Sequence, residues 1–427
     1  ILESQEKYRL ALSITLAALA GLARSPSGNT RLLVHLFTEA TPEVIFLFRE
    51  ARSMMLPDCT QLSELTLTAA SMFCDFCEGH LHNLPTVERG PVFAAAGEIL
   101  SHFSEMLATD GIQQCSGRAP DLTEGNSHLI AFASSDALVL VFTLLSALSN
   151  QDFMDDNDSA IMSSLLQRGV KLESAAPRVP CSSLPTFNHI VDVLFYGIET
   201  MAPLLDVSLL QSSPLVSDKY FSLLTYLLST HDELFLQWVC KNPETGRQLL
   251  RMLVSKMVWA AGAADSASAC LAMQALQFMA TFHLAQLKSG RLAYSHEVVG
   301  PQAYSCSNSG EEVGLESGIF EYALHHLLEA LLFPHSCNHD IAADCLNTCG
   351  KLLLSLIALS PNSFISYVQR MIYHQPPAQQ SALSDCFTIL TNNGGVDMTK
   401  TDRMNCRKFV GNLRVFIRDV RPLLMYR

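Results

Sequence analysis

The clearest hydrophobic pattern in the chain lies in residues 184–241. Apolar residues recur there at intervals of three and four, which is the period of one face of an α-helix. A first run comprises Phe187, Ile190, Val191, Leu194, Ile198 and Met201, and a second comprises Tyr220, Phe221, Leu223, Leu224, Leu227 and Leu228. The pattern predicts one helix, a short linker and a second helix. Pro214 precedes the second run, where the missing N–H group costs no helical hydrogen bond.

The same period continues along the rest of the chain and predicts further helices. One of them starts at Thr41 and Pro42, with Thr41 as the N-cap and proline in the first turn. The others are residues 3–22, 31–37, 60–80, 91–107, 127–148, 159–170, 243–260, 265–287, 315–333, 339–359, 361–373, 376–390 and 401–421. Polar or Pro-, Gly- and Ser-rich segments predict connections at residues 24–30, 110–126, 150–158, 171–183 and 288–314.

These elements predict an all-α fold, because no alternating segment typical of a β-strand occurs. Two helices occupy roughly 40–50 residues, the interval of HEAT-type repeats, so a HEAT-type helical-repeat solenoid (an α-α superhelix) is expected. The predicted repeat regions are residues 1–108, 127–170 after a polar connector, 184–287 and 315–427. Residues 288–314 are predicted to be a flexible loop.

The amino-acid composition limits the kinds of molecule that the chain is expected to bind. Of the 427 residues, 49% are hydrophobic and 16% are charged, and the net charge is −13. Nucleic-acid binding needs clustered Lys and Arg, so an acidic chain argues against a nucleic-acid partner and fits a basic protein partner or a plain soluble surface. The chain opens at Ile1 inside a helical pattern, which suggests a fragment of a longer protein.

Thirteen cysteines without paired spacings indicate free thiols in a reducing compartment. The longest apolar run without charges, residues 266–287, is long enough to cross a membrane. Gln274, Gln277 and Thr281 draw a polar stripe along it, which favours a buried solenoid helix over a transmembrane helix. A helical membrane protein is therefore a disfavoured alternative.

Three patches carry a resemblance to a known family. They are PLVSDKYFSLL (214–224), NHDIAADCL (338–346) with SFISYV (363–368), and QPPAQQSALSDCF (375–387) with FVGNLRVFI (409–417). Over roughly residues 184–427 the chain resembles the C-terminal part of nuclear export receptors of the importin-β superfamily, of the exportin-4 and exportin-7 types. These patches are packing motifs and contain no catalytic signature.

The resemblance implies a nuclear transport receptor that shuttles between nucleus and cytoplasm. Such receptors bind the GTP form of the Ran GTPase together with protein cargo, and release the cargo when GTP is hydrolysed. The main Ran-binding repeats of the family lie nearer the N-terminus than this segment. The implied partners are Ran, phenylalanine-glycine nucleoporins and a protein cargo, which for the exportin-4 type is a hypusine-bearing translation factor. A HEAT-type scaffold or regulatory subunit unrelated to transport is the alternative.

Cys74, Cys77, His80 and His82 have the spacing of a zinc ligand cluster. A second Cys pair at fixed spacing is missing, and the two cysteines share the apolar face of a predicted helix with Phe73. Core packing is therefore the favoured interpretation.

The acidic segment NQDFMDDND (150–158) contains Asp152, Asp155, Asp156 and Asp158. It lacks the turn glycine and the final glutamate of a calcium loop. We interpret it as a solvated loop, with a docking surface for a basic protein as the functional alternative.

The remaining candidates are histidines and aromatic residues. His325, His326, His335 and His339 flank the helix break at Phe333–Pro334 and are interpreted as helix-end or surface residues. Aromatic residues of the central stretch, namely Tyr220, Phe221, Tyr226, Phe235 and Trp238, are expected mostly in the core, with exposed edges able to receive phenylalanine side chains of a partner. Catalytic motifs and phosphate loops do not occur. No enzyme activity, cofactor, metal, nucleic-acid partner or membrane span is therefore predicted.

Overall fold

The structure, a computed structural model, describes residues 2–24, 30–53, 60–84, 89–115, 126–155, 187, 189–241, 243–262, 266–290, 318–333 and 345–424. These residues form sixteen α-helices and contain no strand, so the predicted all-α class is confirmed. They fall into two compact units, residues 1–205 and residues 206–427. Each unit is described by itself.

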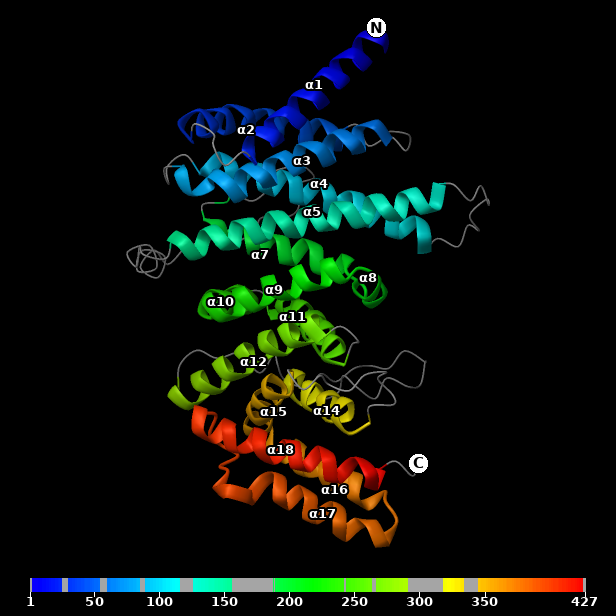
Figure 1. The fold of residues 1–427 in the computed structure, drawn as a ribbon, viewed down its shortest axis with the longest axis vertical. Coiled ribbons are helices and arrows are strands. Elements are labelled where there is room, and N and C mark those ends of the chain that lie inside the picture. The colour runs from blue at the N-terminus through cyan, green and yellow to red at the C-terminus, as the bar shows by residue number, and fades with distance from the viewer. Residues whose placement is uncertain are drawn as a thin grey trace. The chain divides into compact units, whose positions relative to one another are not determined.

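The first unit has two layers of helices. It contains α1 (Leu2–Ala23), α2 (Thr30–Ser53), α3 (Thr60–His80), α4 (Gly90–Cys115), α5 (Asn126–Asp155) and α7 (Ile190–Met201), with short 3₁₀ turns η1 (Leu81–Asn83) and η3 (Ala202–Leu204). One layer is formed by α1, α3 and α5, each packed on the next, and the other by α2, α4 and α7 (Figure 1). Helices of one layer thus alternate along the chain with helices of the other.

Aromatic residues pack both between the two layers and within one of them. Phe37 of α2 stacks on Phe76 of α3, with ring centroids 5.0 Å apart and an interplanar angle of 4°. Phe48 of α2 contacts Phe103 of α4 edge to face, with centroids 5.9 Å apart. All four rings are buried, and burial of each such side chain stabilises the fold by about 1.5–3 kcal/mol.

The second unit repeats the two-layer arrangement. Its helices are α8 (Val207–Ser212), α9 (Pro214–Thr230), α10 (Asp232–Lys241), α11 (Pro243–Ala261), α12 (Ser266–Ser289), α14 (Ile319–Leu332), α15 (Leu346–Leu359), α16 (Pro361–Tyr373), α17 (Pro377–Asn392) and α18 (Arg403–Leu424). Helices α9, α12, α15 and α18 pack in sequence as one layer. Helices α10, α11, α14 and α16 form the other, and α17 packs on α16 and α18 (Figure 1).

Two buried asparagines fix α18 to the segment before it. The amide of Asn405 accepts from Asp397 N (2.8 Å) and donates to the carbonyls of Asp397 (2.5 Å) and Lys400 (2.6 Å). The amide of Asn412 donates to the carbonyls of Leu390 (3.3 Å) and Asn393 (2.9 Å). These carbonyls, at the end of α17 and in the following loop, therefore have partners, as buried polar groups require.

The structure corrects the prediction around Thr41 and Pro42. A single helix, α2, runs through both residues, and Pro42 lies inside it. Thr41 is not an N-cap, because its hydroxyl donates to the carbonyl of Phe37 at 2.8 Å. The apolar face formed by Phe37, Val44 and Phe48 is buried on both sides of the proline. We attribute the continuity of the helix to this burial, which outweighs the one hydrogen bond that proline removes.

Three further boundaries differ from the predictions. The central stretch contains four helices, α7 to α10, because Asp206 caps the additional helix α8 and α9 ends before His231. Residues 150–155, predicted as part of a loop, continue α5, and α4 extends to Cys115. The predicted helix 159–170, the linker 171–183 and nearly all of the predicted loop 288–314 lie outside the described residues.

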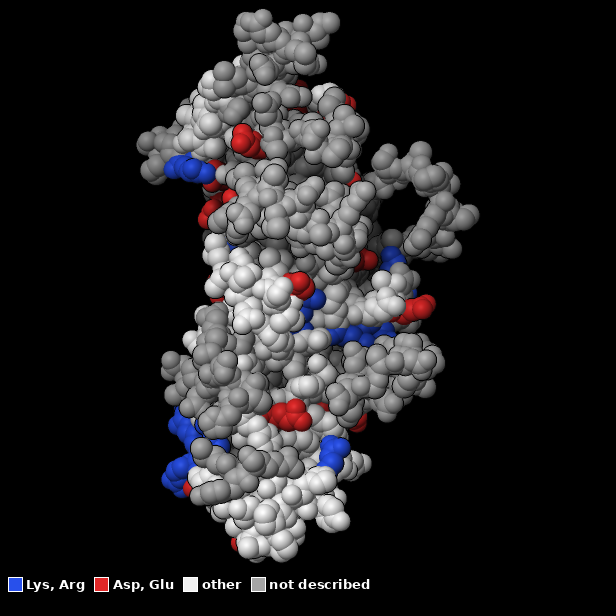
Figure 2. Space-filling model, turned by 90° about the vertical axis from the view of Figure 1, so that its right-hand side faces the viewer, with Lys and Arg blue, Asp and Glu red and all other residues white. Residues whose placement is uncertain are grey.

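The distribution of surface charge and the apolarity of the helices complete the description of the fold. On the face shown in Figure 2, charged side chains are few among the described residues, in agreement with a charged content of 16%. Within the described part of the chain, no single helix is long and apolar enough to cross a membrane. The pair α15 and α16 meets that test only jointly, and it is bent by 106°.

Candidate functional site

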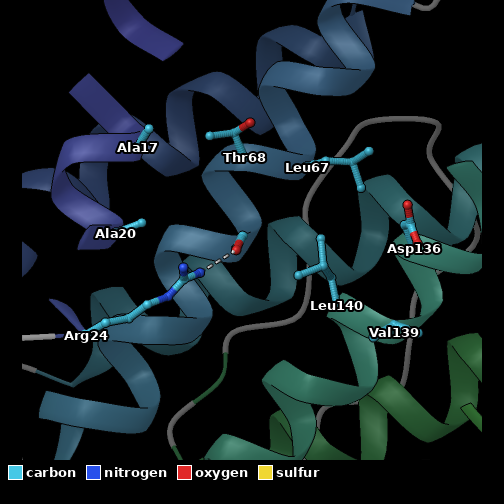
Figure 3. Close-up of a pocket in the computed structure, with 9 residues that line it drawn as sticks. Ala17, Ala20, Arg24, Leu67, Thr68, Asp136, Val139 and Leu140 are labelled. Carbon is cyan, nitrogen blue, oxygen red and sulfur yellow. Dashed lines mark hydrogen bonds between the residues drawn. The ribbon is translucent and has the colours of Figure 1, made fainter. Parts of the chain in front are cut away.

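A groove of about 530 Å³ lies in the first unit, between α1, α3 and α5 (Figure 3). The groove is lined by Ala17 and Ala20 of α1 and by Arg24, which follows α1 directly. The other lining residues are Leu67, Thr68 and Ser71 of α3 and Asp136, Val139 and Leu140 of α5. The groove therefore follows from the way these three successive members of one layer pack.

Small side chains create the space in the groove. Ala17 and Ala20 are three residues apart on α1, so they share the face that points toward α3. Opposite them, Leu67 and Leu140 close the groove with aliphatic carbon. The hydroxyl of Thr68 already donates to the carbonyl of Glu64 within its own helix, at 2.8 Å. The centre of the groove is thus mainly apolar.

One end of the groove is polar. Nη2 of Arg24 lies 2.7 Å from Oδ2 of Asp75 and 3.4 Å from Oγ of Ser71, so α1 is joined to α3. The neighbouring carboxylate of Asp75 raises the pKa of Arg24, which stays charged. Asp136 lies at the α5 side of the groove and is exposed. A peptide ligand with an apolar side chain, flanked by its own polar backbone groups, would match this distribution of groups in the groove.

The cysteine cluster predicted from sequence lies behind this groove. Cys74 Sγ donates to the carbonyl of Leu140 at 3.6 Å and thereby links α3 to α5. Cys77 is completely buried, and burial raises the pKa of its thiol well above the ordinary value. His80 Nε2 lies 3.2 Å from the carbonyl of Ala23. Both thiols therefore pack in the helical core, and no group of three or more potential metal ligands occurs among the described side chains.

The acidic candidates are only partly visible. Asp152 and Asp155 belong to the last turns of α5, and their side chains lie outside the described residues. Asp156 and Asp158 lie outside the described residues altogether. A docking surface formed by the four aspartates therefore stays a prediction.

The histidine candidates have different surroundings in the structure. His325 Nε2 lies 2.9 Å from Ser363 Oγ, and its ring stacks on Tyr367 with centroids 5.3 Å apart. Burial, together with the charge of Arg370, lowers the pKa of His325. His326 instead lies 3.9 Å from Glu329 in its own helix. His335 and His339 are outside the described residues.

The aromatic residues of the central stretch are mostly core residues, as predicted. Tyr220, Phe221 and Phe235 are completely buried, whereas Tyr226 and Trp238 are half-buried. The hydroxyl oxygen of Tyr226 lies 3.5 Å from Nε2 of His231. Tyr226 and Trp238, which are half-buried, are the aromatic residues of this stretch that a partner can reach.

Sequence reasoning missed the groove residues. The relevant signal was the small-residue face of α1, where Ala17 and Ala20 stand at helical spacing among leucines. It also missed the arginines of the last helix, whose spacing places several of them on one face. Comparisons with models of protein families, with curated proteins and with solved structures give no match to this chain.

Proposed function

We propose that the chain is a protein-binding segment of a nuclear export receptor, which carries protein cargo through the nuclear pore in a cycle that depends on Ran-GTP. The sequence resemblance over residues 184–427 supports this function. The two-layer arrangement supports it as well, since a chain in which each helix packs on the next helix of its layer is built like a helical-repeat array.

The observation that carries the proposal furthest is the groove between α1, α3 and α5. Export receptors of the resembled family pass the pore by binding phenylalanine side chains of nucleoporin repeats. The apolar lining of Ala17, Ala20, Leu67 and Leu140 suits a phenyl ring, and 530 Å³ is ample for one. The polar end, with Arg24 and Ser71, provides partners for the backbone around that ring. We assign the groove to a phenylalanine of a phenylalanine-glycine repeat.

Ran binding tests the transport function as a whole. The natural full-length protein is immobilised and incubated with Ran loaded with GTP or with GDP, in the presence and absence of cell extract as a source of cargo. A strong preference for the GTP form, increased by cargo, is the expected result. Equal or absent binding of both forms by a folded, helical protein contradicts the proposal and leaves a HEAT-type scaffold unrelated to transport.

Substitutions in the groove test the assignment of the phenylalanine site. Ala17→Trp places an indole in the groove from an exposed position, so it blocks the site without filling the core. Ala18→Trp is the matched control, because Ala18 is also exposed on α1 but does not line the groove. Binding of a fluorescent peptide with several phenylalanine-glycine repeats is measured by anisotropy. We expect weaker binding for Ala17→Trp only, and equal binding by both variants counts against this site.

A further inference from the structure

The outward face of α18 carries a straight row of arginines. Arg403, Arg407, Arg414 and Arg418 are exposed and follow one another at intervals of four, seven and four residues. At about 100° per residue they fall within about 60° of the helix circumference, and they span about 22 Å along its axis. Six of the 22 residues of α18 are basic and one is acidic, although the whole chain has a net charge of −13. Helix α18 thus carries a local excess of positive charge, whereas the chain as a whole is negatively charged.

Most of this row has no partner among the residues that the structure describes. Arg403, Arg407 and Arg414 form no ion pair or hydrogen bond with any other residue that the structure describes. Arg418 pairs with Asp419 through contacts of 2.7 and 3.2 Å. Asp402, at the start of the helix, is engaged in capping, since its carboxylate accepts from the backbone of Met404 and Asn405 at 3.0 Å each. Three guanidinium groups are therefore available to carboxylates of another molecule.

The opposite face of α18 holds the row in place. Phe409, Leu413 and Phe416 are buried, and the amides of Asn405 and Asn412 bind the preceding segment through the hydrogen bonds described above. A partner would consequently order only arginine side chains and not the helix itself. Preorganisation of this kind lowers the entropic cost of binding.

A gap in the row allows close approach. Gly411 lies between Arg407 and Arg414 on the same side of the helix, and a Cβ atom built at this position has no atom within 4 Å apart from the adjacent residues and the nearby backbone of α18 itself. A partner helix can therefore approach the backbone of α18 at the middle of the row. In Figure 2, Lys and Arg side chains gather at the left edge of the molecule at the height of α18.

The chemistry of this face selects a protein partner. Proteins that hold single-stranded nucleic acid combine basic residues with aromatic rings on which bases stack. The exposed positions of α18 are Arg403, Met404, Arg407, Lys408, Gly411, Arg414, Arg418 and Pro422, and none of them is aromatic. Arginine forks match carboxylates through two parallel hydrogen bonds. An acidic helix with carboxylates three and four residues apart presents the same periodicity as the row.

We propose that the arginine row of α18 is a docking surface for an acidic helical segment of a partner protein. This inference goes beyond the transport function and does not depend on Ran or on the groove of the first unit. The partner's glutamates or aspartates lie along one face and pair with Arg403, Arg407 and Arg414, and its backbone passes over Gly411.

A labelled peptide tests the proposal directly. The probe is a fluorescein-labelled 21-residue helix of alanine and glutamate, with glutamates on one face at spacings of three and four. Its binding to the whole chain is measured by anisotropy at low salt. We expect Arg407→Glu combined with Arg414→Glu to raise the Kd at least tenfold. Gly411→Leu, which leaves every charge in place, is expected to raise it severalfold because it blocks close approach.

Matched controls separate this surface from a general effect of charge. Lys219→Glu combined with Lys241→Glu changes the net charge by the same amount on α9 and α10, and it should leave the Kd within twofold. The same peptide with glutamine in place of glutamate should not bind. Thermal unfolding of each variant verifies that the chain stays folded.

Three results overturn the proposal. The first is absence of binding of the glutamate peptide to the unaltered chain, and the second is equal weakening by the two double variants. The third comes from two competing probes, a 20-nucleotide single-stranded RNA and phosphatidylcholine vesicles with 30% phosphatidylserine. Tighter binding of either probe than of the peptide, lost with Arg407→Glu and Arg414→Glu, assigns the row to nucleic acid or to membrane.

Discussion

Gly350 of α15 lies directly against Val410 of α18. A Cβ atom at position 350 would be 2.7 Å from Cγ2 of Val410 and 3.6 Å from its Cα atom. Leu413 of α18 is the next neighbour, at 3.2 Å. The two helices approach this closely only because position 350 has no side chain, so α18 is positioned partly by the absence of a methyl group on its neighbour.

Replacing Gly350 with alanine is expected to destabilise the protein by about 1–3 kcal/mol, because the added methyl group would crowd the side chains of Val410 and Leu413. The gain in helix propensity offsets about 1 kcal/mol of the clash. Chemical denaturation followed by circular dichroism measures the change. Gly411→Ala is the control, since its methyl group points into open space and should stabilise the protein by about 0.5–1 kcal/mol. Equal effects of the two substitutions would contradict the contact.

Replacing Asn405 with aspartate tests the anchoring of α18. The substitution keeps the acceptor for Asp397 N but removes the two donors that reach the carbonyls of Asp397 and Lys400. Because a buried site loses two hydrogen bonds and gains a charge, we expect a loss of about 2–4 kcal/mol in the free energy of unfolding. Asn392→Asp, at an exposed position near the end of α17, serves as control and should change it by less than about 0.5 kcal/mol.

Stability should depend on pH through His283. Its ring is buried and stacks on Phe320 with centroids 5.0 Å apart, and burial lowers its pKa to about 4. Between pH 6.5 and pH 4 the unfolded chain binds a proton at this residue that the folded chain does not, so stability falls as the pH falls. Over this interval the loss approaches about 3 kcal/mol.

His283→Leu removes this titration and keeps an apolar side chain against Phe320. We expect the variant to lose less stability than the unaltered protein between pH 7 and pH 4.5, as measured by denaturant titration at each pH. His326→Gln removes an exposed histidine and should leave the pH dependence as it is. A His283→Leu variant with the pH profile of the unaltered chain argues against a buried neutral imidazole.

Thiol reactivity should separate buried cysteines from accessible ones. Cys77 and Cys349 are completely buried, and burial raises the pKa of Cys349 to about 12. Since the thiolate is the reactive form, both should resist iodoacetamide in the folded protein at pH 8 and react after denaturation. Cys240, which is half-buried, is the internal reference and should react earlier. Peptide mass spectrometry identifies each labelled site, and rapid labelling of Cys77 without denaturant would rule out its burial.

The sequence predicted the local structure best where helix ends are marked chemically. The predicted helices 60–80 and 361–373 match α3 and α16, and Pro361 marks the start of the second. The prediction failed at Pro42, because a proline that usually begins a helix is tolerated inside one whose apolar face is buried on both sides. Local sequence cannot weigh that burial, which depends on Phe76 and Phe103 of other helices.

The groove could not be predicted for a related reason. Arg24 and Asp75 meet across 51 positions of sequence, and Cys74 meets Leu140 across 66. Helical periodicity assigns each of these residues to a face but does not identify the helix that the face will contact. The arginine row of α18 is different, because spacing within a single helix would have sufficed to define it, although the sequence analysis did not single it out.

The layered order of the second unit has a mechanical consequence. In the layer formed by α9, α12, α15 and α18, each helix packs on its immediate neighbours in the layer, so the contacts connect short stretches of chain. A force that pulls on the two ends of this unit loads those contacts one after another and not all at once. Optical-tweezer traces should therefore show a series of small extension steps, and the segments unfolded in these steps should refold readily when the force is relaxed.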